Sequence, residues 1–434
     1  MNQFTASLWG DEAFSAVLSA KSVPEILKII ARDTSPPLYN LTEHFWFQIF
    51  GSSEIAIRSL SFLYFSLALV FVYLIGSYLW NKKVGLWAAL LTFLNPFFFT
   101  YAFEGRMYSI LALGVTASMY FFIRKKWLGY ILATIFALYC HHFAIFAVFT
   151  QGLWFLYIWL RGDRKTAWNI FKSFIAIILL YSAWLWPLYQ QTKMVGGGFW
   201  LGKPTLIDLL ILIAKYLAVG VNNKLTIPAL VLTLVGLLSR KWLTDKSKTI
   251  FLLAWFLVPI GVTWLISQKF TSIFFDRYLL YTIPAGVLIL VSNQRRFSKI
   301  LLIGLSLLFI VIDVNYFTHP TKRPFRELAT YIKSVEKPGD FLLNWNSAAH
   351  HLWESKYYGI PAPIYLPEGS LPYFVGTALM TKEDTISKIP TKTSRLGVIT
   401  SGPEAEVKIS GFKKLDSQAF GPLTFIIFTP QRAR

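Results

Sequence analysis

Ten apolar segments, separated by short polar connections, run through the first 317 residues. Because about 20 apolar residues in a helix span a bilayer, each segment is predicted to be a transmembrane helix, although several are shorter than that. The predicted spans are residues 57–80, 84–101, 107–123, 127–140, 143–160, 168–189, 225–239, 249–267, 276–292 and 299–317. This pattern predicts a mainly α, polytopic transmembrane helical bundle.

The pattern changes after residue 317, because residues 318–434 contain no apolar run of membrane length. Apolar positions there recur at helical spacing behind Pro324, at Phe325, Leu328, Ile332 and Val335. Short apolar runs follow at residues 341–345, 396–400 and 423–428. The sequence therefore predicts a transmembrane domain over residues 1–317 and a small α/β domain over residues 318–434.

The composition supports insertion in a membrane. Hydrophobic residues make up 55% of the chain, charged residues only 15%, and the mean hydropathy is +0.51. The net charge of +20 lies largely in short loops between apolar segments, where topology and anionic membrane lipids explain it. No nucleic-acid partner is therefore predicted. The single cysteine, Cys140, excludes an internal disulfide and a cysteine-based metal site.

Basic residues cluster at every second connection, which gives the bundle a predicted sidedness. The clusters contain Lys82, Lys83, Arg124, Lys125, Lys126, Arg161, Arg164, Lys165, Arg240, Lys241, Lys246, Lys248, Arg295, Arg296 and Lys299. Lys and Arg in short loops mark the cytoplasmic side. The intervening connections, and by parity the C-terminal domain, are predicted to be extracytoplasmic. A further apolar stretch, residues 204–219, would invert this order if it crossed, so we expect it to lie in the interface.

Residues 1–55 form a first outer loop in this scheme, yet no apolar span or signal peptide precedes them. We therefore expect a first transmembrane helix to be missing from this sequence.

Three acidic residues of this first loop are candidates for proton transfer. Asp11 and Glu12 are adjacent, so their side chains point in different directions, and one can face a substrate while the other pairs. Asp33 precedes the stiff pair Pro36 and Pro37. The alternatives are a solvated acidic pair at a helix N-terminus and an ordinary turn.

The next two outer connections also carry ionisable residues. Glu104, Arg106 and Tyr108 lie at the outer end of a predicted span, where such residues are functional candidates. His141 and His142 occupy the following outer turn, and imidazole could meet a phosphate or a metal. The alternatives are a Glu104–Arg106 pair and a His pair that is simply hydrogen-bonded in its turn.

A late outer connection contributes Arg277 and Tyr278, preceded by Asp276. A guanidinium group there could hold phosphate oxygens with two parallel hydrogen bonds. The alternative is an arginine that snorkels to the interface beside a tyrosine of the aromatic belt.

Five stretches in chain order resemble a known family. They read LWGDEAFSA, DTSPPLYNL, AFEGRMYSILAL, YCHHFAIF and FFDRYLLYTIP. This ordered set, from about residue 8 to residue 290, resembles membrane glycosyltransferases of the GT-C fold. Within that fold it resembles the dolichyl-phosphate-mannose protein mannosyltransferases and the bacterial aminoarabinose transferases. The chain departs from the family's pattern in lacking its first transmembrane helix.

The resemblance implies transfer of a sugar from a polyprenyl phosphate donor to a lipid, protein or polysaccharide acceptor on the outer face, with inversion. It assigns the base to Asp11, with Glu12 as the adjacent acid and Asp33 in the second stretch of the loop. No cofactor is specified. The carboxylates of the outer loops could hold a divalent metal, but their spacing does not define a site.

The resemblance also implies a donor and substrate site from the later loops. Its predicted residues are Glu104, Arg106, Tyr108, His141, His142, Arg277 and Tyr278. Among them, His142 and Arg277 are expected near the donor phosphate.

Two other classes of function stay open. A multi-pass transporter or flippase for a lipid or sugar would be expected to show inverted repeats and ionisable residues near the membrane midplane. The sequence shows neither, since its acidic residues gather at one end of the spans. A membrane receptor or scaffold without catalysis is the second alternative, and consumption of a lipid-linked sugar would separate the three.

Overall fold

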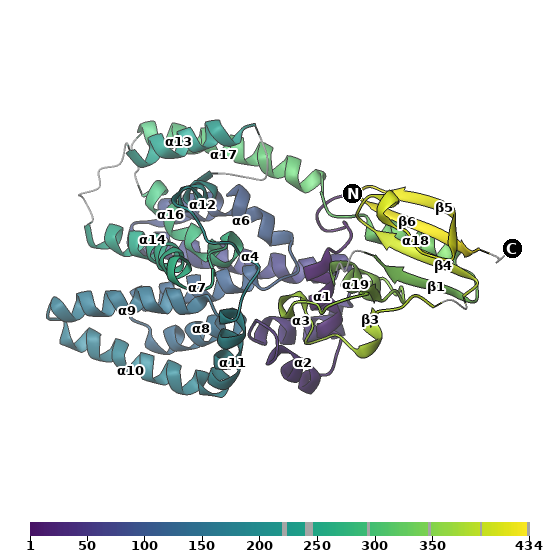
Figure 1. The fold of residues 1–434 in the computed structure, drawn as a ribbon. Helices are drawn as coiled ribbons and strands as arrows, with labels where there is room; N and C mark the ends of the chain where they lie inside the picture. Colours follow the sequence, from purple (N-terminus) through teal and green to yellow (C-terminus); the bar gives the residue numbers. More distant parts are fainter. Residues whose placement is uncertain (219–223, 239–245, 293–295, 346–348, 391–392, 432–434) are drawn as a thin grey trace. The chain divides into compact units, whose positions relative to one another are not determined.

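The computed structural model describes residues 1–434 except 219–223, 239–245, 293–295, 346–348, 391–392 and 432–434 (Figure 1). Its contacts divide the chain into two compact units. We call residues 34–39 and 58–319 the membrane unit, and residues 1–33, 40–57 and 320–434 the head unit. The predicted division into domains at residue 317 stays a prediction, because contacts alone do not show which segments fold independently.

The regular secondary structure in the described part of the membrane unit is helical, and each of the ten predicted spans lies largely in helix. Its elements are α4 (Glu54–Leu79), α5 (Lys82–Phe93), α6 (Pro96–Thr100), η1 (Tyr101–Phe103), α7 (Tyr108–Ile123), α8 (Trp127–Cys140), α9 (Ala144–Leu160), α10 (Arg164–Tyr181), η2 (Ser182–Trp184), α11 (Leu185–Gly196), α12 (Leu206–Ala218), α13 (Thr226–Leu238), α14 (Lys246–Lys269), α15 (Asp276–Leu279), η3 (Leu280–Thr282), α16 (Ile283–Val291) and α17 (Arg296–Thr318).

Within the described residues, four helices are long and apolar enough to cross a membrane: α4, the α10–α11 pair, α14 and α17. The α5–α6 pair counts as a fifth if its bent halves form one span, and α7, α8, α9 and α13 are shorter apolar helices. Large apolar side chains cover outward faces, such as Leu179 at 67% and Ile300 at 64% exposure. The chain is therefore a multi-pass membrane protein.

The predicted span 84–101 is broken rather than continuous. Its two parts, α5 and the α6–η1 segment, meet at a bend of 57°. Pro96 cannot donate a backbone hydrogen bond, and the Asn95 side chain accepts one from the N–H of Phe98, so a new helix begins here. The Asn95 amide also donates to the carbonyl of Tyr216 on α12. This break sets the direction in which the chain enters the loop that carries Glu104.

The α7 and α8 helices approach each other closely because small residues face one another. A Cβ added at Gly114 would lie 2.9 Å from Cα of Ala137. Residues 204–219 contain the helix α12, which packs against α6, α13 and α16. Its orientation along the membrane interface stays a prediction.

The head unit combines the two ends of the chain. Its helices are α1 (Gly10–Ser19), α2 (Val23–Ile30), α3 (Leu38–Phe50), α18 (Phe325–Val335) and α19 (Ala349–Tyr357). Its strands are β1 (Asp340–Asn344), β2 (Ile364–Tyr365), β3 (Thr385–Ile386), β4 (Arg395–Thr400), β5 (Phe412–Phe420) and β6 (Leu423–Pro430). The predicted C-terminal helix and the three predicted strands are confirmed as α18, β1, β4 and β6.

These strands form one mixed sheet in the order β3-β2-β1-β4-β6-β5, parallel from β3 to β4 and antiparallel at β6 (Figure 1). The apolar face of α18, with Leu328 and Ile332, packs on Phe425 and Ile427 of β6. Far from this in sequence, α1 lies along α19, and the N–H of Leu8 donates to the Tyr358 hydroxyl over 2.8 Å. The first residues of the chain are thus built into the C-terminal α/β structure.

Candidate functional site

The predicted site residues fall into both units. Asp11, Glu12 and Asp33 belong to the head unit, and the other seven belong to the membrane unit.

Asp11 and Glu12 lie in the first turn of α1, where carboxylates favour the exposed N–H groups of a helix. Glu12 is fully buried, accepts the N–H of Trp9 over 3.4 Å and pairs with Lys322 Nζ at 2.8 Å. Asp11 retains 23% exposure and lies 3.9 Å from Nδ1 of His350. Glu12 therefore anchors the helix, whereas the Asp11 carboxylate is accessible.

Asp33 ends the turn that follows α2, where its N–H donates to the carbonyl of Ile30 over 3.1 Å. Its side chain is largely buried, at 7% exposure. It belongs to the same unit as Asp11 and Glu12, and α3 begins five residues later at Leu38.

Two buried ionisable groups on α19 were not predicted. Glu354 is fully buried 3.8 Å from the Arg323 guanidinium, and His351, also fully buried, precedes it by nearly one turn. Within the described part of the chain, neither the Glu354 oxygens nor the His351 ring nitrogens have a hydrogen-bond partner. Burial raises the pKa of Glu354 to about 8 and lowers the pKa of His351 to about 3. The sequence did contain a signal for His351, because His350 and His351 form a second pair of adjacent histidines in the chain.

These two shifts predict the pH dependence of unfolding. Between pH 6.5 and 8 the folded state holds the Glu354 proton that the unfolded state has lost, so stability falls as pH rises. At lower pH, down to about 4.5, uptake of a proton by unfolded His351 opposes this trend. Glu354→Gln, which keeps the neutral shape, should flatten the fall above pH 6.5 in thermal unfolding of the purified protein. The control Glu368→Gln changes an exposed residue and should keep the loss of stability above pH 6.5. An equal loss of stability in both variants would contradict the assignment of this pH dependence to Glu354.

The membrane unit brings Glu104 to Arg277 from a distant loop. Glu104 Oε1 lies 3.9 Å from Arg277 Nη1, and the two side chains are only 12% and 15% exposed. The sequence left open a pair between Glu104 and Arg106; the structure records an ion pair of Glu104 with Arg277. Arg277 is enclosed by protein, which does not suit the snorkelling alternative.

Aromatic rings surround the Arg277 guanidinium. Its central carbon lies 5.4 Å from the ring centre of Tyr108, 5.0 Å from that of Phe275 and 6.0 Å from that of Tyr278. The His141 ring stacks obliquely on Tyr278 at 5.0 Å. We call Glu104, Tyr108, His141, Arg277 and Tyr278 the Arg277 cluster.

The short helix α15, which carries Arg277, is held by α12. Lys215 Nζ lies 2.8 Å from Asp276 Oδ2, and the Tyr216 hydroxyl donates to the backbone carbonyl of Asp276. Neither residue was predicted as part of the site, because this contact joins segments 60 residues apart in sequence.

The histidines occupy the turn between α8 and α9, and their hydrogen bonds fix their tautomers. His141 Nδ1 accepts the N–H of Phe143 over 3.1 Å, so the neutral ring carries its proton on Nε2. The His142 Nε2 lies 2.7 Å from Oε1 of Gln191, whose amide donates to the carbonyl of Ser35. This arrangement makes Nε2 of His142 the donor to Gln191.

Electrostatics keep both imidazoles neutral. Burial, and then the charges of His142, Arg106 and Arg277, lower the pKa of His141 well below its ordinary value. Burial lowers the pKa of His142 to about 4. Arg106 and Arg277 thus both lie in the electrostatic surroundings of His141. The Arg277 guanidinium and the Nε2 proton of His141 are the donors that the Arg277 cluster can offer a phosphate.

The described residues contain no group of three or more His, Cys, Asp or Glu side chains that could hold a metal ion.

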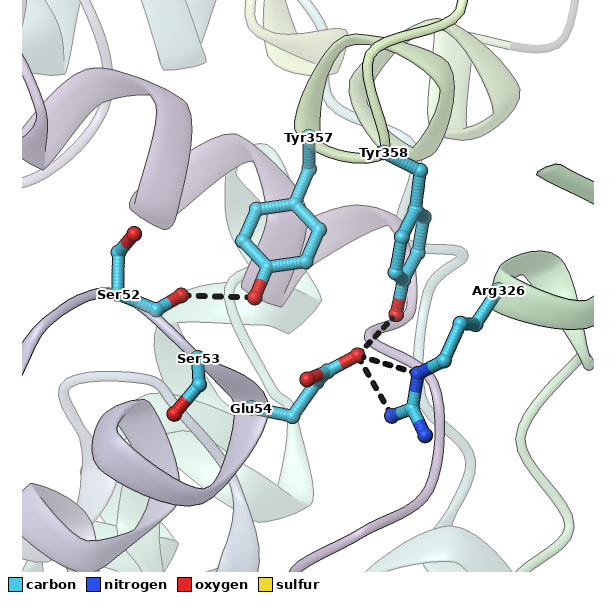
Figure 2. A pocket seen from close by; sticks show the side chains of 6 residues that line it. All are labelled: Ser52, Ser53, Glu54, Arg326, Tyr357 and Tyr358. Carbon is cyan, nitrogen blue, oxygen red and sulfur yellow. Dashed lines mark hydrogen bonds and ion pairs between the residues drawn. The ribbon is translucent and has the colours of Figure 1, made fainter. Parts of the chain in front are cut away.

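An open hollow in the head unit is lined by six residues that were not predicted: Ser52, Ser53, Glu54, Arg326, Tyr357 and Tyr358. Figure 2 shows Glu54 at its centre, accepting hydrogen bonds from Arg326 Nε at 2.8 Å and from the Tyr358 hydroxyl at 2.9 Å. The Tyr357 hydroxyl donates to the carbonyl of Ser52 over 2.7 Å. These bonds join Arg326, Tyr357 and Tyr358 to residues 52–54, which belong to the same unit.

No sequence family and no curated protein sequence matches this chain. Its fold does match solved structures. ArnT from Cupriavidus metallidurans in the apo state aligns with 98% of this chain and 94% of that chain, at 12% identity and a TM-score of 0.65. ArnT from the same organism bound to undecaprenyl phosphate aligns over the same shares at 12% identity, with a TM-score of 0.64.

The mycobacterial arabinofuranosyltransferase AftD also aligns, at 12% identity and a TM-score of 0.50. The alignment covers 100% of this chain but 40% of AftD. The chain therefore has the fold of the GT-C membrane glycosyltransferases, as the order of its motifs predicted.

Proposed function

We propose that this protein is a glycosyltransferase that moves a sugar from a polyprenyl phosphate to an acceptor hydroxyl on the extracytoplasmic face of the membrane. The observation that carries the proposal is the GT-C fold, which this chain shares over 98% of its length with an ArnT structure bound to undecaprenyl phosphate. The enclosed guanidinium of Arg277, surrounded by aromatic rings, supports it independently.

Arg277 is proposed to bind the donor phosphate. A lipid phosphate reaches its site from within the bilayer, and its charge needs cationic groups in surroundings of low dielectric constant. Arg277 and Arg106 supply these charges, and His141 supplies a neutral N–H donor from Nε2. As the bond from the anomeric carbon to the phosphate oxygen breaks, the oxygen keeps the electron pair, and these groups stabilise it.

Asp11 is proposed as the general base. Its carboxylate takes the proton of the acceptor hydroxyl while that oxygen forms its bond to the anomeric carbon. A single displacement of this kind inverts the configuration at that carbon. Asp11 suits the role better than Glu12, because Glu12 is buried against Lys322 and caps α1. Asp33 is the next candidate.

The acceptor is proposed to be a hydroxyl of a lipid, a protein or a polysaccharide. The head unit is proposed to be extracytoplasmic, because the basic connections assign the opposite side to the cytoplasm.

The direct test is turnover by the purified protein in detergent. We expect it to release polyprenyl phosphate from synthetic polyprenyl phosphate hexoses or pentoses in the presence of membrane extract as acceptor, measured by mass spectrometry. Nucleotide sugars are the matched control and should stay intact. A protein that leaves every lipid-linked sugar uncleaved, yet moves one across proteoliposomes, would be a transporter or flippase instead.

A further inference from the structure

His350 lies against the proposed base from the far end of the sequence. It stands in the first turns of α19, and its Nδ1 is 3.9 Å from Oδ1 of Asp11. Its ring stacks on Trp9 with ring centres 6.1 Å apart and planes 21° apart. The imidazole is therefore held between the residue before α1 and the carboxylate in its first turn.

Gly10 makes this approach sterically possible. A Cβ at residue 10 would lie 2.1 Å from His350 Nδ1 and 2.5 Å from its Cβ, far inside van der Waals contact. Any other residue at this position would displace the His350 ring, because α1 and α19 pack directly on each other here.

The other ionisable residues near His350, on α1 and α19, are largely paired with charges other than His350 or are neutral. On α1, Glu12 pairs with Lys322 at 2.8 Å. On α19, Glu354 faces Arg323, and burial favours its protonated form. Burial keeps His351 neutral. Asp11 is consequently the carboxylate to which His350 is directed.

We propose that His350 positions the Asp11 carboxylate and receives the proton that Asp11 takes from the acceptor; this inference rests on the proposed function. The acceptor hydroxyl gives its proton to Asp11, and its oxygen bonds to the anomeric carbon as the phosphate departs with the electron pair. Asp11 then passes the proton to Nδ1 of His350, and the resulting imidazolium releases it to water, since His350 is 48% exposed.

The second transfer runs downhill. An aspartic acid ordinarily has a pKa of about 4 and an imidazolium about 6.5, so a proton on Asp11 moves to neutral imidazole and the base is regenerated. The 3.9 Å separation closes by a small rotation of either side chain, and such contacts commonly tighten when the substrate binds. A protonated His350 could not receive this proton and would hold Asp11 in an ion pair.

The test compares His350→Gln, Gly10→Ala and the exposed control His319→Gln in steady-state turnover as a function of pH. We expect His350→Gln to lower kcat on the order of 100-fold with an unchanged donor KM, and to shift the acidic limb of the profile to lower pH. His319→Gln should match the wild type.

Gly10→Ala should reproduce the loss by displacing the ring, but should add nothing in a His350→Ala background, as expected for residues acting through one contact. An unchanged kcat and pH profile in His350→Gln, in an enzyme that Asp11→Asn inactivates, would overturn this inference and leave the proposed function standing. Retained turnover in Asp11→Asn would instead refute the assignment of the base. Additive losses in the double variant would mean that Gly10 acts on packing alone, which would also overturn the inference.

Discussion

Asp11→Asn is expected to lower turnover of the lipid-linked donor by about 100- to 10,000-fold, the usual contribution of a general base. The amide keeps the size and hydrogen-bonding shape of the carboxylate but cannot accept the acceptor's proton. Because Asp11 is partly exposed and Glu12 carries the buried ion pair of this helix turn, the fold should persist. Release of polyprenyl phosphate measures the chemistry, and thermal unfolding measures the fold.

Asp416→Asn is the matched control, since it makes the same change at an exposed position of β5 in the same unit. It should leave turnover at the wild-type rate. Near-normal turnover by Asp11→Asn would remove Asp11 from the role of base, and Asp33→Asn would be the next variant to measure.

Arg277→Ala is expected to weaken binding of undecaprenyl phosphate by about 2 to 5 kcal/mol, the usual loss when one partner of an enclosed, hydrogen-bonded charge pair is removed. Arg277→Lys should restore only part of the affinity, because an ammonium group cannot reproduce the two parallel hydrogen bonds of a guanidinium. Titration of the purified protein with undecaprenyl phosphate measures the loss directly.

One control addresses the partner that Arg277→Ala leaves behind. Removing the guanidinium deprives Glu104 of its ion pair at 3.9 Å, and the remaining carboxylate could itself repel the phosphate. Arg277→Ala with Glu104→Gln separates the two causes. If the double variant still binds undecaprenyl phosphate weakly, the loss of affinity is due to the missing Arg277 side chain. Recovery to wild-type affinity, or an unchanged affinity in Arg277→Ala alone, would show that the arginine does not bind the donor.

The local pattern of the chain was enough to predict the helices of the membrane unit, the helix α18 and the apolar runs that form β1, β4 and β6. Apolar runs gave segments such as 107–123 and 127–140, which the structure forms as the apolar helices α7 and α8. Helical spacing behind Pro324 predicted residues 325–335, the bounds of α18. These predictions succeed because periodicity and end signals act between residues a few positions apart.

The arrangement of side chains in the candidate site was decided only by tertiary structure. The fold brings Glu104 to Arg277, a contact between residues far apart in the sequence. Gln191, which fixes the tautomer of His142, comes from 49 residues away. His350 reaches Asp11 across most of the chain. Contacts of this kind depend on which helices pack together, and short-range hydrophobic patterns contain no information on that choice. The sequence by itself therefore determined the elements and the residue types available for chemistry, and the packing of distant segments determined which of them meet.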